Sequence, residues 1–389
     1  MQIDPTAASK SATPLLLDED SGAREAWKKL LAAMDEATSR VYSEEMGLNE
    51  VDRAEGMRAL AQTFSLAAEL HIEKGNPREP AFTNWMASRR KVLGDNPDAR
   101  YDSAPVSADY AYEVYGTLSG CAAQTFTVYG RGELGWNNVA GELIPSQMEL
   151  GPNGEFSVVL SKERPADAKN WIELNDSAHM FLMRQFFNDV PIEKRPRDFE
   201  IRRLDAPNAP EIYTEAEFAK RTDAAAKFVQ IAVNATFGLA QMRSDPANSM
   251  EPPKQFDPSI VGIYYPSVYN IYFGGWFDLA EDEALIFEGE DLRGGYGIVH
   301  VMNGWLQSIE GPGGNQKFNK STLTTRADGS WQTIVAHRDP GHPNWLNPHG
   351  HQKGHFTLRI VHPDGDGTSR PNARKVKFAE LESMISAHA

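Results

Sequence analysis

The chain has 389 residues and a formal net charge of −15, from 54 acidic and 39 basic side chains. Hydrophobic residues make up 41% and charged residues 24%, an ordinary globular composition that excludes a wholly disordered chain. A negative surface repels phosphate backbones and anionic lipid heads, so neither nucleic acid nor a membrane is expected as a partner. Domains of about 100–200 residues are usual, which predicts two or three here.

The single cysteine, Cys121, excludes an internal disulfide and a thiolate metal cage. We expect a buried, inert thiol, with a nucleophile as the alternative. No apolar stretch approaches the roughly 20 residues of a membrane span, and residues 1–20 lack the apolar core of a signal peptide. The sequence therefore predicts a cytoplasmic protein with a disordered tail over residues 1–20.

Residues 21–93 are predicted to form a helical N-terminal region. A first helix begins near Ser21, and a second begins at the N-cap Asn49, with Asp52 three residues later. The apolar residues expected to be buried on these two helices are Trp27, Leu30, Leu31, Met34 and Val41 on the first, and Met57, Leu60, Ala61, Phe64 and Leu70 on the second. Together they are expected to pack as a helical hairpin.

Residues 94–189 are predicted to be a first β-rich region, because aromatic and β-branched residues alternate there between glycine turns. Within it, residues 179–187 fit either a strand or a short buried helix, since periodicity alone does not separate the two. Residues 190–255 read as a helical connection. Its strongest helix, 214–243, is capped by Thr214 with Glu217 three residues on.

The last region, 256–389, consists of short strand-like segments separated by Gly, Asn, Asp and Pro. That spacing is typical of antiparallel strands in a sandwich or jelly roll. The predicted fold class is α+β, mainly β, with antiparallel jelly-roll-like sandwich regions, a helical N-terminal part and a helical insertion. No glycine-rich phosphate loop is present, so neither NAD nor ATP is expected, and we predict no cofactor.

A histidine-rich stretch over residues 336–356 is the first candidate for chemistry. In an extended segment His349 and His351 would lie on one side, and with a distant carboxylate they could hold zinc, iron or manganese. Glycine and proline interrupt the stretch, which favours solvated loop histidines over this weak metal candidate. A third reading is metal-free catalysis by His337 beside Asp339.

A second candidate is the loop that contains Asp95, Asn96, Asp98 and Tyr101. Two close carboxylates with separated pKa values could act as acid and base. Short polar side chains that bond their own backbone give ordinary turns with the same composition. From residue types alone, the turn interpretation is favoured.

The third candidate is an aromatic run in the C-terminal region. Its members are Tyr264, Tyr265, Tyr269, Tyr272, Phe273, Trp276 and Phe277. Core packing explains most of them, but each buried tyrosine hydroxyl needs a partner. An aromatic-lined cavity with phenol donors suits an apolar ligand that bears a few oxygens.

Several phrases of the sequence recur in one bacterial family. They are AEGMRAL (54–60), GDNPDARY (94–101), NWIEL with MRQFF (170–187), YYPSVYNIYFGGWFDLAEDEALIFEG (264–289), and AHRDPGHPNWL with GHQKG and Arg359 (336–359). With these phrases in order over most of residues 50–362, the chain resembles the family known as domain of unknown function 1214. The resemblance implies two β-rich halves with helices, the C-terminal half jelly-roll-like, and it transfers no activity. The positions that match family phrases are Asp95, Asn96, Asp98, Tyr101, Arg184, Gln185, Tyr265, Tyr272, Asn344, Trp345, His351 and Arg359.

Our leading hypothesis is a cofactor-independent acid/base enzyme, a lyase, hydratase, isomerase or hydrolase. Its substrate would be a small, apolar, oxygen-bearing molecule such as a terpenoid, a steroid or an aromatic catabolite. The residues assigned to it are Asp95, Asp98, Tyr265, Tyr272 and His337 for catalysis, and Asn96, Tyr101, Arg184, Tyr269, Trp276, Asn344 and Trp345 for substrate binding. The alternatives are a non-catalytic jelly roll that binds carbohydrate or another ligand, and a His-ligated metalloenzyme. The chain could also form a homo-oligomer.

Overall fold

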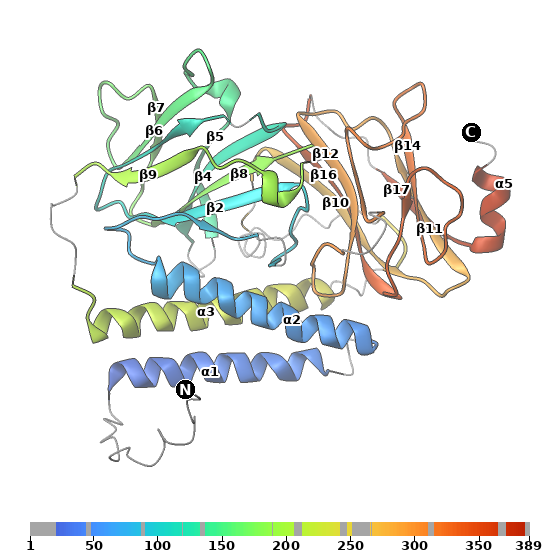
Figure 1. Ribbon diagram of the computed structural model, residues 1–389, viewed down its shortest axis with the longest axis horizontal. Helices are drawn as coiled ribbons and strands as arrows, with labels where there is room; N and C mark the ends of the chain where they lie inside the picture. Colours follow the sequence, from blue (N-terminus) through green and yellow to red (C-terminus); the bar gives the residue numbers. More distant parts are fainter. Residues whose placement is uncertain are drawn as a thin grey trace, which may run out of the picture.

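The computed structural model describes most of the chain. The described residues are 21–43, 48–86, 90–118, 120–132, 137–188, 190–205, 212–241, 247–250, 265, 267–309, 315–364 and 371–385. The predicted tail 1–20, Tyr264 and the predicted boundary at 255/256 lie outside them. Two β-rich halves stand side by side, and three long helices run beneath them in the view of Figure 1.

The N-terminal half is built from two facing sheets. The first contains, in spatial order, β1 (Thr83–Asn84), β2 (Ala99–Pro105), β8 (Ala178–Phe186), β4 (Ala123–Arg131) and β5 (Asn137–Leu143). The second contains β7 (Asn170–Glu173), β6 (Glu155–Ser161), β3 (Tyr112–Thr117) and β9 (Phe199–Arg203). Alternate side chains of each, such as Phe181 and Val158, form a shared apolar core. The ambiguous segment 179–187 is therefore mostly strand.

The C-terminal half repeats this two-sheet arrangement. Its inner sheet contains β10 (Asn270–Asp278), β16 (Lys353–Val361), β12 (Tyr296–Met302) and β13 (Lys317–Asn319). Its outer sheet contains β15 (Trp345–Leu346), β14 (Trp331–Ala336), β11 (Glu283–Gly289) and β17 (Asn372–Lys377), and the short helix α5 (Leu381–Ile385) follows. Residues such as Val299, Leu358 and Phe287 fill the space between these sheets. The prediction of a mainly β, α+β fold is confirmed.

The helical part contains α1 (Gly22–Val41), α2 (Glu50–Ala67) with the π-helical turn Ala68–Glu73 after it, and α3 (Glu215–Gln241). Both predicted N-caps are present. Asn49 Oδ1 accepts from the Asp52 amide at 2.9 Å, and Thr214 Oγ1 accepts from the Glu217 amide at 3.2 Å. Among the described residues no helix is long and apolar enough to cross a membrane.

The buried faces of α1 and α2 differ from the prediction. Trp27, Leu31 and Met57 are 41%, 47% and 37% exposed, so their predicted burial is wrong, as is that of the exposed Ala61. The residues that are buried instead are mostly small: Ala26, Ala33 and Ala37 on α1, and Gly56, Ala59 and Ala67 on α2. Small side chains let helices approach closely, and hydrophobicity alone does not reveal such a face.

Gly56 lies where α2 meets the C-terminal half. A Cβ atom there would lie 2.5 Å from Trp305 Cζ2 and 2.9 Å from Val41 Cγ1. Gly→Ala inside a helix usually stabilises by about 1 kcal/mol. We expect Gly56→Ala to lower the free energy of unfolding instead, by about 1–3 kcal/mol, because the site becomes overpacked. Urea unfolding measures this, with Gly22→Ala, whose Cβ meets nothing within 4 Å, as the control. A stabilised Gly56→Ala protein would contradict the prediction.

Candidate functional site

The inner sheets of the two halves face each other, β2 and β8 on one side and β12 and β16 on the other (Figure 1). An apolar cluster joins them, formed by Ala99, Ala123 and Phe186 from the N-terminal half and Tyr296, Ile298 and Val361 from the C-terminal half. The Phe186 and Tyr296 ring centroids are 5.3 Å apart. Since side chains alternate along a strand, the same inner faces also carry the polar residues described next.

Asp98 anchors this contact. It is fully buried, and its Oδ2 accepts from the Tyr296 hydroxyl at 3.0 Å and from Asn319 Nδ2 at 2.7 Å. Its Oδ1 pairs with Lys317 Nζ and lies 4.0 Å from Arg195 Nη2. Burial and the Asp98 charge raise the pKa of Tyr296 well above its usual value. Three of these four partners, Tyr296, Lys317 and Asn319, belong to the C-terminal half, so Asp98 ties the two halves together.

The other predicted residues of this loop also have structural partners. Asp95 accepts from the Ser308 amide at 2.7 Å and from its hydroxyl at 2.6 Å. Asn96 Oδ1 accepts from the Asp98 amide at 2.9 Å and from the Tyr296 hydroxyl at 3.1 Å. The carboxylates of Asp95 and Asp98 share none of these partners. Their contacts are those of residues that stabilise a turn and hold the loop in place. A catalytic role for Asp95 or Asp98 stays a prediction.

Beside the apolar cluster lies a set of five residues that we call the inter-sheet polar cluster. Its members are Tyr101 on β2, Arg184 on β8, Tyr272 on β10, His300 on β12 and Arg359 on β16. Tyr272 and Arg359 are cross-strand neighbours, with the guanidinium carbon 5.8 Å from the ring centroid. The Arg184 guanidinium carbon lies 6.0 Å from the Tyr101 ring centroid.

Arg184 is a buried cation within a dense network. Its Nη1 donates to Thr127 Oγ1 at 3.1 Å, and its Nη2 donates to the Tyr129 hydroxyl and to the Tyr265 carbonyl. Thr127 in turn donates to Glu142 Oε1 at 2.5 Å. Burial disfavours the charge, but nearby phenols and Glu142 hold the pKa of Arg184 above its usual value. The guanidinium therefore stays charged and has a carboxylate close by.

His300 is fully buried, and neither of its ring nitrogens has a hydrogen-bond partner among the residues that the structure describes. Burial, helped by the positive charge of Arg359, lowers the pKa of His300 well below its usual value. At neutral pH the imidazole is consequently uncharged, with one nitrogen able to donate and the other able to accept. Buried polar groups are nearly always paired, so this exception calls for an explanation.

Two phenols complete the inter-sheet polar cluster. Burial raises the pKa of Tyr101 to about 12, which keeps its hydroxyl protonated at neutral pH. Tyr272 is 40% exposed and accepts from Asn270 Nδ2 at 2.9 Å. The cluster therefore extends from a buried interior to the solvent.

Tyr265 contributes its backbone more directly than its ring. Its φ of 50° is in the left-handed region, and its carbonyl accepts from Arg184. The ring packs edge-on against Trp85 and Tyr129, with centroids 4.8 and 5.4 Å away. The side chain is hydrogen-bonded to Asn137, and burial raises its pKa to about 12. Proton donation by Tyr265 is a prediction that these contacts leave untested.

Two further aromatic residues predicted to bind substrate lie near β10. The Tyr269 hydroxyl accepts from Gln147 Nε2 at 2.7 Å. The Trp276 ring stands edge-on to the His355 ring, with centroids 4.5 Å apart. Neither residue belongs to the inter-sheet polar cluster.

The remaining predicted residues, His337, Asn344 and Trp345, lie on β15 of the outer sheet of the C-terminal half or in the loop that joins β14 to β15. His337 Nε2 lies 3.0 Å from a backbone carbonyl, and Asp339 accepts from a nearby loop amide, so the two do not pair as expected. The Asn344 amide bonds two backbone carbonyls, at 2.7 and 2.9 Å. Trp345 Nε1 donates to the backbone carbonyl of Ala336 at 2.8 Å. These side chains are bound to the backbone and are not brought together with the inter-sheet polar cluster.

The two histidines considered as metal ligands have separate partners. His351 Nδ1 lies 2.6 Å from Asp52 Oδ1, and its Nε2 lies 3.3 Å from Glu55 Oε2. His349 Nε2 instead contacts the Gln316 amide. The described residues contain no group of three or more His, Cys, Asp or Glu side chains arranged to hold a metal ion. The two imidazoles therefore do not form the predicted pair, and His351 instead links α2 to the C-terminal half.

Cys121 is half-buried, and its thiol donates to Gln124 Oε1 at 3.4 Å. Burial raises the pKa of the thiol to about 11. A thiol that stays protonated at neutral pH is a poor nucleophile, which agrees with the expected inert role.

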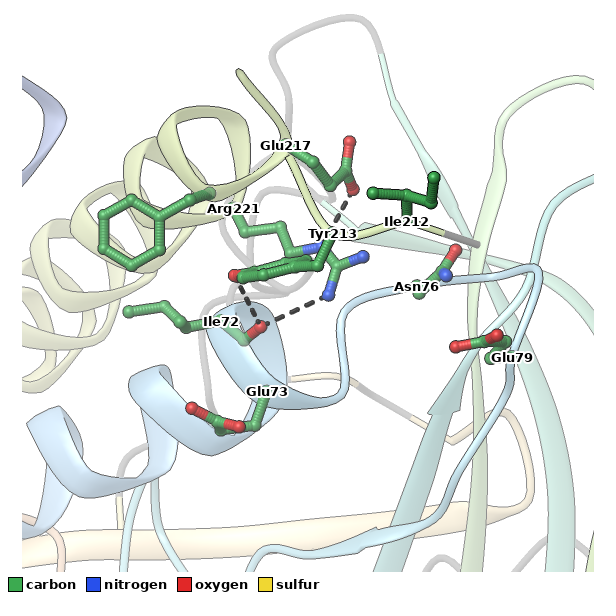
Figure 2. A pocket seen from close by; sticks show the side chains of 9 residues that line it. Ile72, Glu73, Asn76, Glu79, Ile212, Tyr213, Glu217 and Arg221 are labelled. Carbon is green, nitrogen blue, oxygen red and sulfur yellow. Dashed lines mark hydrogen bonds and ion pairs between the residues drawn. The ribbon is translucent and has the colours of Figure 1, made fainter. Parts of the chain in front are cut away.

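A separate surface pocket of about 300 Å³ lies between the π-helical turn and the start of α3 (Figure 2). Its lining residues are Ile72, Glu73, Asn76, Glu79, Ile212, Tyr213, Glu217, Phe218 and Arg221. Arg221 Nε donates to Glu217 Oε1 at 2.8 Å, and its guanidinium stacks on the Tyr213 ring, 4.7 Å from the centroid. Arg221, the cation that lines the pocket, thus has both an acidic and an aromatic partner.

Comparison with known proteins points to one family. Two segments, residues 97–189 and 305–365, match the family model described as Protein of unknown function (DUF1214). The resemblance to DUF1214 is confirmed. The DUF1214 segments come from different halves of the molecule and meet where Asp98 pairs with Lys317. Tyr101, Arg184 and Arg359 lie inside them.

Solved structures similar to this chain include an uncharacterized protein from Burkholderia cenocepacia. It is 26% identical, with a TM-score of 0.83, over 92% of this chain and 98% of that one. The VPA0106 protein from Vibrio parahaemolyticus is 12% identical, with a TM-score of 0.50, over 82% of this chain and 98% of that one, which shows a likeness of fold alone. None of the curated proteins matches the chain significantly.

The sequence did not point to His300, Tyr296, Lys317 or Asn319. His300 stands in the apolar run IVHVM, where it is the only polar side chain. A lone ionisable residue inside a continuously apolar strand was the available signal, because burying an ionisable group is costly unless it has a role.

Proposed function

We propose that this protein is a cofactor-independent acid/base enzyme whose small, oxygen-bearing substrate binds at the inter-sheet polar cluster. The observation that supports the proposal most is the buried His300, unpaired among the described residues. Leaving a buried polar group without a partner costs about 1–3 kcal/mol, and exceptions of this kind gather at functional sites. A substrate that offers an oxygen and a proton would supply the missing partners.

Each residue of the cluster then has a role. The neutral His300 imidazole would exchange a proton with the substrate or orient its oxygen. The Tyr101 phenol would donate to that oxygen, while the charges of Arg184 and Arg359 would stabilise negative charge developing on it in a low-dielectric setting. An apolar body, as in a terpenoid, a steroid or an aromatic catabolite, would lie against the rings of Tyr101 and Tyr272. These roles fit a lyase, hydratase, isomerase or hydrolase.

In this proposal Asp95 and Asp98 are positioning residues rather than the acid and base. Their hydrogen bonds join the loop before β2 to the C-terminal half: Asp98 bonds Tyr296 on β12 and Asn319 on β13, and Asp95 bonds Ser308 beyond the end of β12. The distance between the two inner sheets, and with it the geometry of the inter-sheet polar cluster, would depend on them.

The test begins with the molecule that co-purifies with the wild-type protein, identified by native mass spectrometry and then supplied as substrate. His300→Gln and Tyr101→Phe are each expected to lower kcat/KM by about 100-fold or more, since a positioned acid or base contributes about 10²–10⁴-fold. Tyr42→Phe, at an exposed tyrosine that ends α1 and has no assigned role at the site, is the matched control and should keep full activity. Unchanged turnover in both cluster variants would overturn the proposal.

A non-catalytic ligand-binding jelly roll is the second candidate. The observation that favours it is the 40% exposure of Tyr272, whose ring is covered on one side by Arg359, as in sites that bind a sugar face. Saturable binding of the co-purified molecule without any turnover would support this reading over the enzyme.

A further inference from the structure

We infer that the molecule bound at the inter-sheet polar cluster is an anion that presents a carboxylate to Arg359. This deepens the proposed function and rests on it for the place of binding, but not for any reaction. Three features carry the inference: the incomplete hydrogen bonding of Arg359, the balance of charge around it, and its neutral neighbours.

Arg359 is only partly satisfied by the protein. Its Nη2 donates to the Gly94 carbonyl at 2.7 Å, which the left-handed φ of 71° at Gly94 makes available. Its Nε is buried and has no hydrogen-bond partner in the described part of the chain. No carboxylate of a described residue lies within 4.0 Å of its nitrogens, whereas Arg184 reaches Glu142 through Thr127. A guanidinium of this kind lacks a counter-charge.

The surrounding charges do not supply that counter-charge. Asp98 is shared between Lys317 and Arg195. Asp95 is held by the amide and hydroxyl of Ser308. Neither carboxylate forms an ion pair with Arg359, so among the described residues this guanidinium has no acidic partner, although the whole chain has a net charge of −15. Arg359 is half-buried and its Nε is buried without a partner in the described part of the chain, so a ligand that brings a negative charge to this Nε is favoured.

The neutral neighbours indicate a single negative charge on the ligand. Besides the free Nε of Arg359, the donors at hand are the phenol of Tyr101 and one nitrogen of His300, both uncharged at neutral pH. Phosphate groups carry up to two charges and are usually bound by several cationic side chains. One guanidinium with an unpaired Nε, flanked by neutral donors, matches a carboxylate better.

The experiment compares probes that differ only in charge. The pairs are benzoate and benzamide, cyclohexanecarboxylate and its amide, and hexanoate and its amide, with phenyl phosphate as the phosphate arm. Isothermal titration calorimetry of the full chain at pH 7 should show at least one carboxylate binding about 10-fold or more tightly than its amide. Arg359→Gln should remove that preference and leave the affinity for the amide unchanged. Arg202→Gln, which removes an exposed cation on β9, should change neither.

Each other outcome overturns the inference. Equal binding of acid and amide that is lost in His300→Gln would mean a neutral ligand, and the proposed function would survive. Tighter binding of phenyl phosphate would replace the carboxylate by a phosphate. If no probe binds the wild type, or if binding changes in neither Arg359→Gln nor His300→Gln, the inter-sheet polar cluster is not the binding site. The proposed function would then fail as well. The wild-type comparison of acid with amide holds even if Arg359→Gln does not fold.

Discussion

Asp98→Ala is expected to lower the free energy of unfolding by about 3–5 kcal/mol, the usual cost of removing one partner from a buried ion pair. The substitution would leave Lys317 and Arg195 without their shared carboxylate, and Tyr296 and Asn319 without an acceptor. Because these partners lie in both halves of the molecule, we expect the two halves to separate more easily in Asp98→Ala than in the wild type. Thermal and urea unfolding measure the loss.

The control for this prediction is an ion pair of the same chemistry on the surface. Asp176 pairs with Lys162 at 2.6 Å, but their side chains are 83% and 62% exposed. Asp176→Ala should therefore change stability by less than about 1 kcal/mol. The conservative variant Asp98→Asn separates structure from catalysis. Lost turnover at an unchanged melting temperature would show that Asp98 is catalytic and would contradict the anchoring role argued here.

Local signals in the sequence predicted the elements well, because their causes are local. The Asn49 and Thr214 caps are fixed by side chains that bond amides three residues away, and the structure contains both. The burial of Trp27 and Leu31 was predicted from hydrophobicity and proved wrong, because the neighbouring helices pack on alanines of α1 instead. Which face of a helix is covered depends on the partner, and the partner is not encoded in the helix itself.

The candidate site could be predicted only in part. Tyr101, Arg184 and Tyr272 were singled out from family phrases and aromatic spacing, and the structure brings them together. His300, another member of the inter-sheet polar cluster, lies about 200 residues from Tyr101 in the sequence, and only the pairing of the two halves places it there. Contacts between segments that are distant in the sequence produce no periodic pattern of residues. For this reason Asp98 resembled an ordinary turn residue in the sequence.

Raising the pH from about 6.5 to 9 is expected to destabilise the protein through His351. Burial disfavours the imidazolium, but Asp52 and Glu55 outweigh it and raise the pKa of His351 to about 9 in the folded state. Against an unfolded value near 6.5, the protonated form stabilises the fold fully below about pH 6.5, and this contribution is lost as the pH rises through about 9. The shift corresponds to about 2–4 kcal/mol of stability.

The measurement is urea unfolding at several pH values between 6 and 10 for the wild type and two variants. His351→Gln should be less stable than the wild type at pH 6.5 and should show a flatter profile up to pH 9, because the titrating group is gone. His349→Gln is the matched control from the same loop: burial lowers the pKa of His349 below its usual value, so its loss should leave the slope above about pH 7.5 intact. Parallel profiles for the wild type and His351→Gln would mean that Asp52 and Glu55 hold a neutral imidazole. The link between α2 and the C-terminal half would then be a set of hydrogen bonds without a charge that alkaline pH could remove.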